Sequence, residues 1–165
     1  MRREQIRAGR IVGVHGIRGE LKVQALERDA EFLASCGTFL LEGRPVTPTA
    51  RRVHKDQLLL KLPGVEDRTA AEALRGKELY IRRADAELPE GEYFDEELIG
   101  LDVYNGETGA CIGELTAVER YPASKVYTVR GVKEFLVPAV QGAFILGVDL
   151  ESNRMDIRVW EGMME

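Results

Sequence analysis

A short glycine-rich stretch constrains this chain more than any other feature of the sequence. Residues 9–23 read GRIVGVHGIRGELKV, in which Gly13, Gly16 and Gly19 recur at every third position. Glycine-rich loops bind nucleotide phosphates when they open a helix, whose N-terminus then holds the anion. Here residues 20–25 instead alternate polar and apolar side chains, which is the period of a half-buried strand. The three glycines are therefore predicted to form the structural turn of a hairpin rather than a nucleotide site.

Charge is distributed unevenly along the chain, which the formal net charge of −5 conceals. Residues 1–88 hold 17 Lys+Arg against 13 Asp+Glu, a net charge of +4, whereas residues 89–165 hold 6 against 15, a net charge of −9. A basic surface suits the phosphate backbone of a nucleic acid, and an acidic surface suits a basic protein. The halves are expected to face different partners, although an acidic surface also serves simply to keep a small domain soluble.

Short strands separated by turn residues dominate the pattern. A helix is predicted at residues 69–76, because Thr69 and Glu72 have capping-box spacing and Gly76 is placed to end it. A carboxylate-rich stretch with Pro and Gly then marks a linker. The expected fold class is all-β, with two small β-barrels and a short helix. The expected domains are a first barrel at residues 1–86, a linker at 87–97 and a second barrel at 98–165.

The sequence offers little from which to build a catalytic site. It lacks GxSxG, HExxH and CxxC, and its two cysteines, Cys36 and Cys111, are far apart. No membrane-span-length apolar run and no secretory signal are visible, so a cytoplasmic location is expected. We expect no enzyme activity, no metal and no cofactor. An RNA-modifying or nucleotide-dependent enzyme stays as the alternative, because catalytic carboxylates meet only in the fold.

Three segments in order resemble one protein family. They are residues 9–23, residues 64–76 (GVEDRTAAEALRG), and residues 98–101 (LIGL) with an aromatic pair just upstream. Together with LVPAV at residues 136–140, they closely resemble the RimM family of bacterial ribosome maturation factors. The resemblance covers essentially the whole chain.

The resemblance implies a fold, a function and a partner. It implies a six-stranded N-terminal barrel, like the second domain of translation factors, followed by a PRC-type barrel. It implies a monomeric, non-enzymatic assembly factor of the small ribosomal subunit that aids head maturation and ribosomal RNA processing. The implied protein partner is small-subunit ribosomal protein nineteen, which is basic and therefore agrees with the acidic second half.

Four side chains near the glycines are predicted to contact the ribosome or its RNA. Arg10, Arg18 and Lys22 are candidates for phosphate contacts, which make affinity fall with salt. His15 is a candidate for stacking or hydrogen bonding on RNA. The alternative is that the three cations are ordinary solvated residues and that His15 only stabilises the hairpin.

A second candidate site, for the protein partner, lies in the predicted linker. Tyr93 and Phe94 fall where the family has an aromatic pair, typically two tyrosines, and Glu96 and Glu97 follow them. Aromatic side chains in such a place act as binding anchors or fill the gap between two barrels. The phenylalanine lacks the second hydroxyl group, so only stacking or burial is available at position 94.

Overall fold

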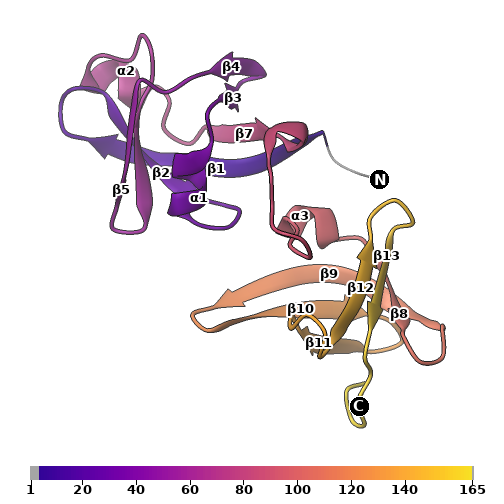
Figure 1. Cartoon of the computed structure of the whole chain (residues 1–165). Coiled ribbons are helices and arrows are strands. Elements are labelled where there is room, and N and C mark those ends of the chain that lie inside the picture. The colour runs from indigo at the N-terminus through magenta and orange to yellow at the C-terminus, as the bar shows by residue number, and fades with distance from the viewer. Residues whose placement is uncertain (1–3, 165) are drawn as a thin grey trace. The chain divides into compact units, whose positions relative to one another are not determined.

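The computed structural model describes residues 4–164, and it divides them into two compact units (Figure 1). The first unit extends through Glu87, and the second begins at Leu88. Most of the stretch predicted as a linker therefore belongs to the second unit. The all-β fold class is confirmed, because strands make up most of the regular structure in both units.

The first unit is a single seven-stranded sheet in which every strand pair is antiparallel. Its spatial order is β4-β3-β7-β1-β2-β6-β5. The strands are β1 (Gln5–His15), β2 (Glu20–Ala25), β3 (Phe39–Leu41), β4 (Arg44–Val46), β5 (Ala50–His54), β6 (Gln57–Lys61) and β7 (Glu78–Arg82).

The sheet has seven strands, one more than the six expected, and the strand β4 at its edge forms a short hairpin with β3. Glu42 and Gly43 both have positive φ, 52° and 79°, which is the backbone of a two-residue hairpin turn. Pro45 follows this turn in β4, which is one of the two edge strands of the sheet, and it lies opposite Leu40 of β3. A proline is tolerated there because an edge strand does not need every backbone N–H group.

Alternating side chains build the core of the first unit. Leu21 and Val23 of β2 are fully buried, as the period of two predicted. Two short helices lie between the strands, α1 (Ala30–Ser35) and α2 (Arg68–Glu72). The predicted helix is confirmed, but Asp67 rather than Thr69 caps it, by accepting a hydrogen bond of 2.8 Å from the Ala70 N–H group.

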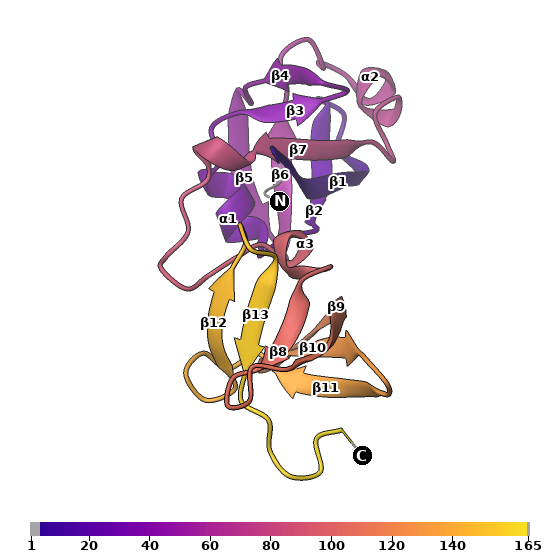
Figure 2. The same cartoon turned by 90° about the vertical axis from the view of Figure 1, so that its right-hand side faces the viewer.

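The second unit is a six-stranded sheet of spatial order β11-β10-β9-β8-β13-β12. Figure 2 shows β12, β13 and β8 side by side, and the β13–β8 pair is parallel. The remaining elements of the chain are η1 (Arg83–Asp85), α3 (Asp95–Leu98), β8 (Asp102–Asn105), β9 (Cys111–Tyr121), β10 (Ser124–Arg130), β11 (Glu134–Pro138), β12 (Ile145–Asp149) and β13 (Arg154–Ile157).

The core of the second unit is apolar and has its own set of side chains. It includes Leu98 from α3, Val103 from β8 and Leu115 from β9, all at most 2% exposed. A hairpin turn at Asn105–Gly106 joins β8 to β9, and the Asn105 N–H group donates to the Ala110 carbonyl group across it. In the part of the chain that is described, no helix is long and apolar enough to span a membrane.

Candidate nucleic-acid interface on the glycine hairpin

The glycine-rich stretch forms the predicted strand–turn–strand, with β1 and β2 paired from Gly9–Ala25 to His15–Glu20. Gly16 and Gly19 bound the turn and have φ values of 72° and 84°, a conformation that favours glycine. A Cβ atom at Gly19 would also clash with the Val65 carbonyl oxygen. Gly13 is different, because it lies within β1 at a shift in register rather than in the turn.

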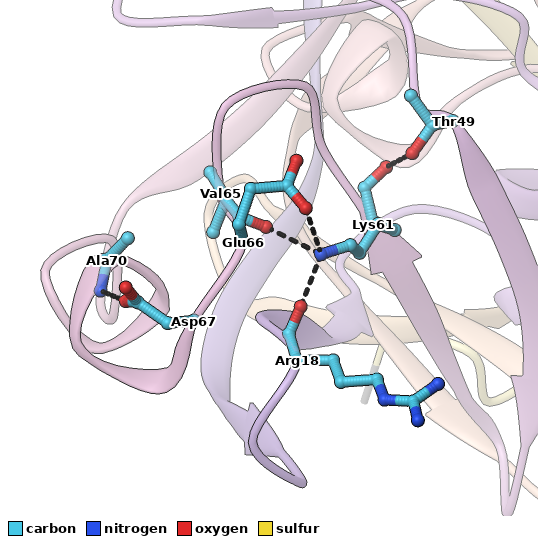
Figure 3. A network of polar contacts seen from close by, with 7 residues as sticks. All are labelled: Arg18, Thr49, Lys61, Val65, Glu66, Asp67 and Ala70. Carbon is cyan, nitrogen blue, oxygen red and sulfur yellow. Dashed lines mark hydrogen bonds and ion pairs between the residues drawn. The ribbon is translucent and has the colours of Figure 1, made fainter.

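Two cations from other elements hold the backbone of this turn, and Figure 3 shows the contacts of one of them, Lys61. The Lys61 ammonium group of β6 donates to the Arg18 and Val65 carbonyl oxygens, the latter at 2.9 Å, and pairs with Glu66 at 3.1 Å. The Arg68 guanidinium group donates to the Gly16 carbonyl oxygen at 3.2 Å. The turn is therefore anchored through its backbone, and Figure 3 shows the Arg18 side chain pointing away from the network.

Arg18 and Lys22 present cationic groups beside this turn. Arg18 is exposed and Lys22 is half-buried. Within residues 4–164 neither side chain pairs with a carboxylate of the chain. A cation without an internal partner is available to a phosphate group, so the geometry leaves both residues suited to the role predicted for them.

Arg10 is placed differently from the other predicted cations. Its guanidinium group pairs with the Glu78 carboxylate of β7 at 2.9 Å, and Arg7 shares that carboxylate at 3.2 Å. Arg10 therefore already has an acidic partner, which a phosphate group would have to displace or share. The contact of Arg10 with a phosphate group stays a prediction, and the Glu78 carboxylate, which the sequence did not reveal as its partner, would compete with that phosphate.

The fold brings His15 together with a residue that no sequence pattern singled out. The ring of His54, at the end of β5, has its centroid 5.9 Å from that of His15. Arg52 of β5 donates to the Glu20 carboxylate at 3.4 Å, and Glu20 is the strand partner of His15. No local pattern pointed to His54 or Arg52, because the contacts depend on how β2, β6 and β5 are paired.

The predicted linker site is changed most by the structure. Phe94 is fully buried and Glu97 is 8% exposed, so neither offers the surface expected of a binding anchor. The physical reason is local: the Glu97 carboxylate accepts a hydrogen bond of 3.1 Å from the Phe94 N–H group at the start of α3. Tyr93 is half-buried against the core of the second unit, and Glu96, three residues later, is also half-buried.

Asp95 ties the start of α3 to the second sheet. Its carboxylate pairs with Arg120 of β9 at 2.6 Å and with Lys125 of β10 at 3.0 Å. Only 13% of the Asp95 side chain is exposed. Burial, with a contribution from the Asp95 charge, raises the pKa of the Tyr127 hydroxyl group to about 12. Of the three consecutive carboxylates at residues 95–97, Asp95 and Glu97 therefore have structural contacts and are not simply solvated.

The titratable groups of the described residues offer no set of metal ligands. Among residues 4–164, no three His, Cys, Asp or Glu side chains lie in a group that could hold a metal ion.

Burial raises the pKa of the Cys36 thiol to about 11, against a smaller opposite effect of the Arg51 charge. A thiol with a raised pKa is a weak nucleophile at neutral pH.

Fold and site together define a chain of two small β units, the first of which carries an anchored hairpin with unpaired cations. The model of the RimM N-terminal domain matches residues 6–86, and the model of the RimM PRC barrel domain matches residues 95–163. The chain therefore belongs to the RimM family. The resemblance inferred from the sequence is confirmed.

Two relatives of known name agree with this assignment. The Ribosome maturation factor RimM of Syntrophotalea carbinolica is 38% identical over 164 residues, which cover 95% of this chain and 93% of the relative. The factor of the same name from Clostridium perfringens is 36% identical, over 91% of this chain and 90% of the relative. Among solved structures, a RimM protein from Pseudomonas aeruginosa is 30% identical and has a TM-score of 0.46, covering 95% of this chain and 98% of its own.

Proposed function

We propose that this protein is a non-enzymatic assembly factor of the small ribosomal subunit, acting in the cytoplasm in head maturation and ribosomal RNA processing. Membership of the RimM family is the observation that carries the proposal, since the relatives are named as ribosome maturation factors. The anchored hairpin with unpaired Arg18 and Lys22 supports a contact with ribosomal RNA.

Small-subunit ribosomal protein nineteen is the proposed protein partner. The support is electrostatic: the second half of the chain carries a net charge of −9, which favours a basic protein. Since Phe94 and Glu97 are buried, Tyr93 and Glu96 are the members of the predicted linker set that remain for such a contact. The factor acts by binding an assembly intermediate more tightly than the finished subunit, which shifts the population along the maturation path.

Co-sedimentation of the full chain with immature and with mature small subunits tests this proposal. We expect binding to the immature subunits that weakens as salt is raised, and weaker binding to mature ones. Equal sedimentation with both, or none with either, would contradict it. Titration calorimetry of the full chain against small-subunit ribosomal protein nineteen tests the partner separately, and hydrolysis of ATP or GTP by the purified chain would favour the enzyme alternative.

A further inference from the structure

Two imidazole rings from separate strands meet on the first unit. His15 ends β1 and His54 ends β5, and their ring planes are tilted by 56° at a centroid separation of 5.9 Å. His54 is exposed and His15 is half-buried. In the described chain, residues 4–164, neither ring takes part in a hydrogen bond or an ion pair. Their nitrogen atoms are therefore available to a ligand.

The charged groups around the rings leave an excess of positive charge. Glu20, the strand partner of His15, is offset by Arg52, which lies two residues before His54 on β5 and contacts the Glu20 carboxylate. The other charged groups on the neighbouring elements are Arg18 in the turn, Lys22 on β2, Lys61 on β6 with its partner Glu66, Arg68 of α2 with its partner Glu72, Arg51 on β5, and the residues Lys55 and Asp56 that follow His54. Arg51 and Arg68 donate to backbone carbonyl groups, so with both rings neutral the excess positive charge comes from Arg18, Lys22, Arg51 and the backbone-bound cations.

This charge balance decides which ligand the rings can take. Paired imidazoles commonly bind transition metals, but a metal cation would meet no third ligand among the described residues and an excess of like charge. An anion is instead attracted by the excess positive charge around the rings. When both rings are protonated they become donors and add two positive charges beside the Arg52–Glu20 pair, so the site then favours an anion that can share Arg52 with Glu20.

We propose that His15 and His54 form, with Arg52, a binding site for a phosphate group of RNA, and that binding there is coupled to protonation of the two rings. The inference rests on the proposed function, in which the first unit faces ribosomal RNA. It adds His54 and Arg52 to the RNA-binding surface, and it makes the affinity of that surface depend on pH.

The composition of the chain makes the coupling measurable. The sequence contains 2 histidines in total, and both are in this site. Imidazole is the side chain whose charge ordinarily changes between about pH 5 and pH 8. A phosphate group that raises the pKa of an ordinary imidazole by one unit makes binding about 5-fold tighter at about pH 5.5 than at about pH 7.5.

Fluorescence anisotropy with the full chain and a transcript of small-subunit ribosomal RNA tests the proposal at the two pH values. The variants are His15→Gln, His54→Gln and the double variant, since glutamine keeps a donor but cannot take up a proton in this range. Arg44→Gln is the matched control, because Arg44 lies on β4 at the opposite edge of the sheet from β5. Wild type and control should show the roughly 5-fold change, and each histidine variant should lose most of it.

Two results would overturn the inference. One is an affinity for the transcript that depends on pH equally in the wild type and in both single variants, since the pH dependence would then come from the RNA. The other is no affinity for the transcript at either pH. The proposed function is judged separately, by co-sedimentation with immature subunits at neutral pH, so a chain that binds subunits without proton coupling fails only the inference.

Discussion

The turn between β1 and β2 and the segment leading into α3 use charge in opposite ways. At the turn, Lys61 and Arg68 come from other elements and hold backbone carbonyl groups, so the local side chain of Arg18 extends outward. At α3, the local carboxylates of Asp95 and Glu97 do the holding themselves. Arg18 is therefore left to a partner because other residues hold its backbone, whereas Asp95 and Glu97 are engaged in holding α3.

Replacing Gly19, the turn glycine with the least space for a side chain, should cause the largest loss of stability. Gly19→Ala forces a Cβ atom against the Val65 carbonyl oxygen at a φ of 84°. We expect a loss of about 3 kcal/mol in the free energy of unfolding, measured with urea. Gly16→Ala is the matched control, since its φ is 72° but nothing lies within 4 Å, and it should cost about 1 kcal/mol. Equal losses would show that the contact with Val65 is unimportant.

The corresponding change at α3 is Asp95→Asn, which leaves Arg120 and Lys125 without their shared carboxylate. We expect the second unit to lose about 2 kcal/mol of stability, because the carboxylate is largely buried and pairs with two cations. Urea unfolding is the measurement, and Glu107→Gln, at an exposed turn position, is the control. A variant as stable as the wild type would mean that α3 is held by its apolar contacts alone.

Alkaline pH should destabilise the protein through Tyr127, which lies in the core of the second unit. Its pKa in the folded state is raised to about 12 from an ordinary value of 10.0, so the unfolded chain ionises first. Stability is therefore fully present below about pH 10 and falls between about pH 10 and pH 12, by at most about 2 kcal/mol. Urea unfolding of Tyr127→Phe at both ends of this range should show a smaller fall. A fall as large as that of the wild type would assign the effect to other groups.

The smallest expected effect, on binding alone, comes from the cations that the turn leaves unpaired. Arg18→Ala with Lys22→Ala should lower the salt dependence of subunit binding by about 0.7 to 0.9 in slope for each phosphate that is no longer neutralised. Arg10→Ala should change the slope less, because Glu78 already neutralises that residue. The measurement is co-sedimentation over a series of salt concentrations. Equal slopes for all three proteins would exclude Arg18 and Lys22 as phosphate-binding residues.

Much of the fold could be predicted because its signals are local. The alternation at residues 20–25 predicted a half-buried strand, and Leu21 and Val23 are buried as that pattern requires. Strand β4 of the edge hairpin was not predicted, because Pro45 indicates an interruption between strands, whereas the edge of a sheet tolerates it. The cap of α2 was placed two residues late, because Asp67 and Thr69 are both good capping residues.

The candidate sites were predicted less well than the fold, because residue type alone does not reveal partners. Arg10 and Lys22 look alike in the sequence, but only Arg10 has a carboxylate opposite it, from a strand nearly seventy residues away along the chain. Glu97 is indistinguishable from Glu96 in a carboxylate run, and the start of α3 selects it to accept the Phe94 N–H group.

The sequence by itself determined the all-β class, the glycine turn, the charge division between the halves and the family. The first three follow from period, turn chemistry and composition, which are properties of neighbouring residues, and the family follows from the resemblance of several motifs to RimM. The tertiary structure alone decided which charges are paired, that Phe94 is buried, and that His15 meets His54. Strand pairing brings together residues that are dozens of positions apart, and no local pattern encodes that register.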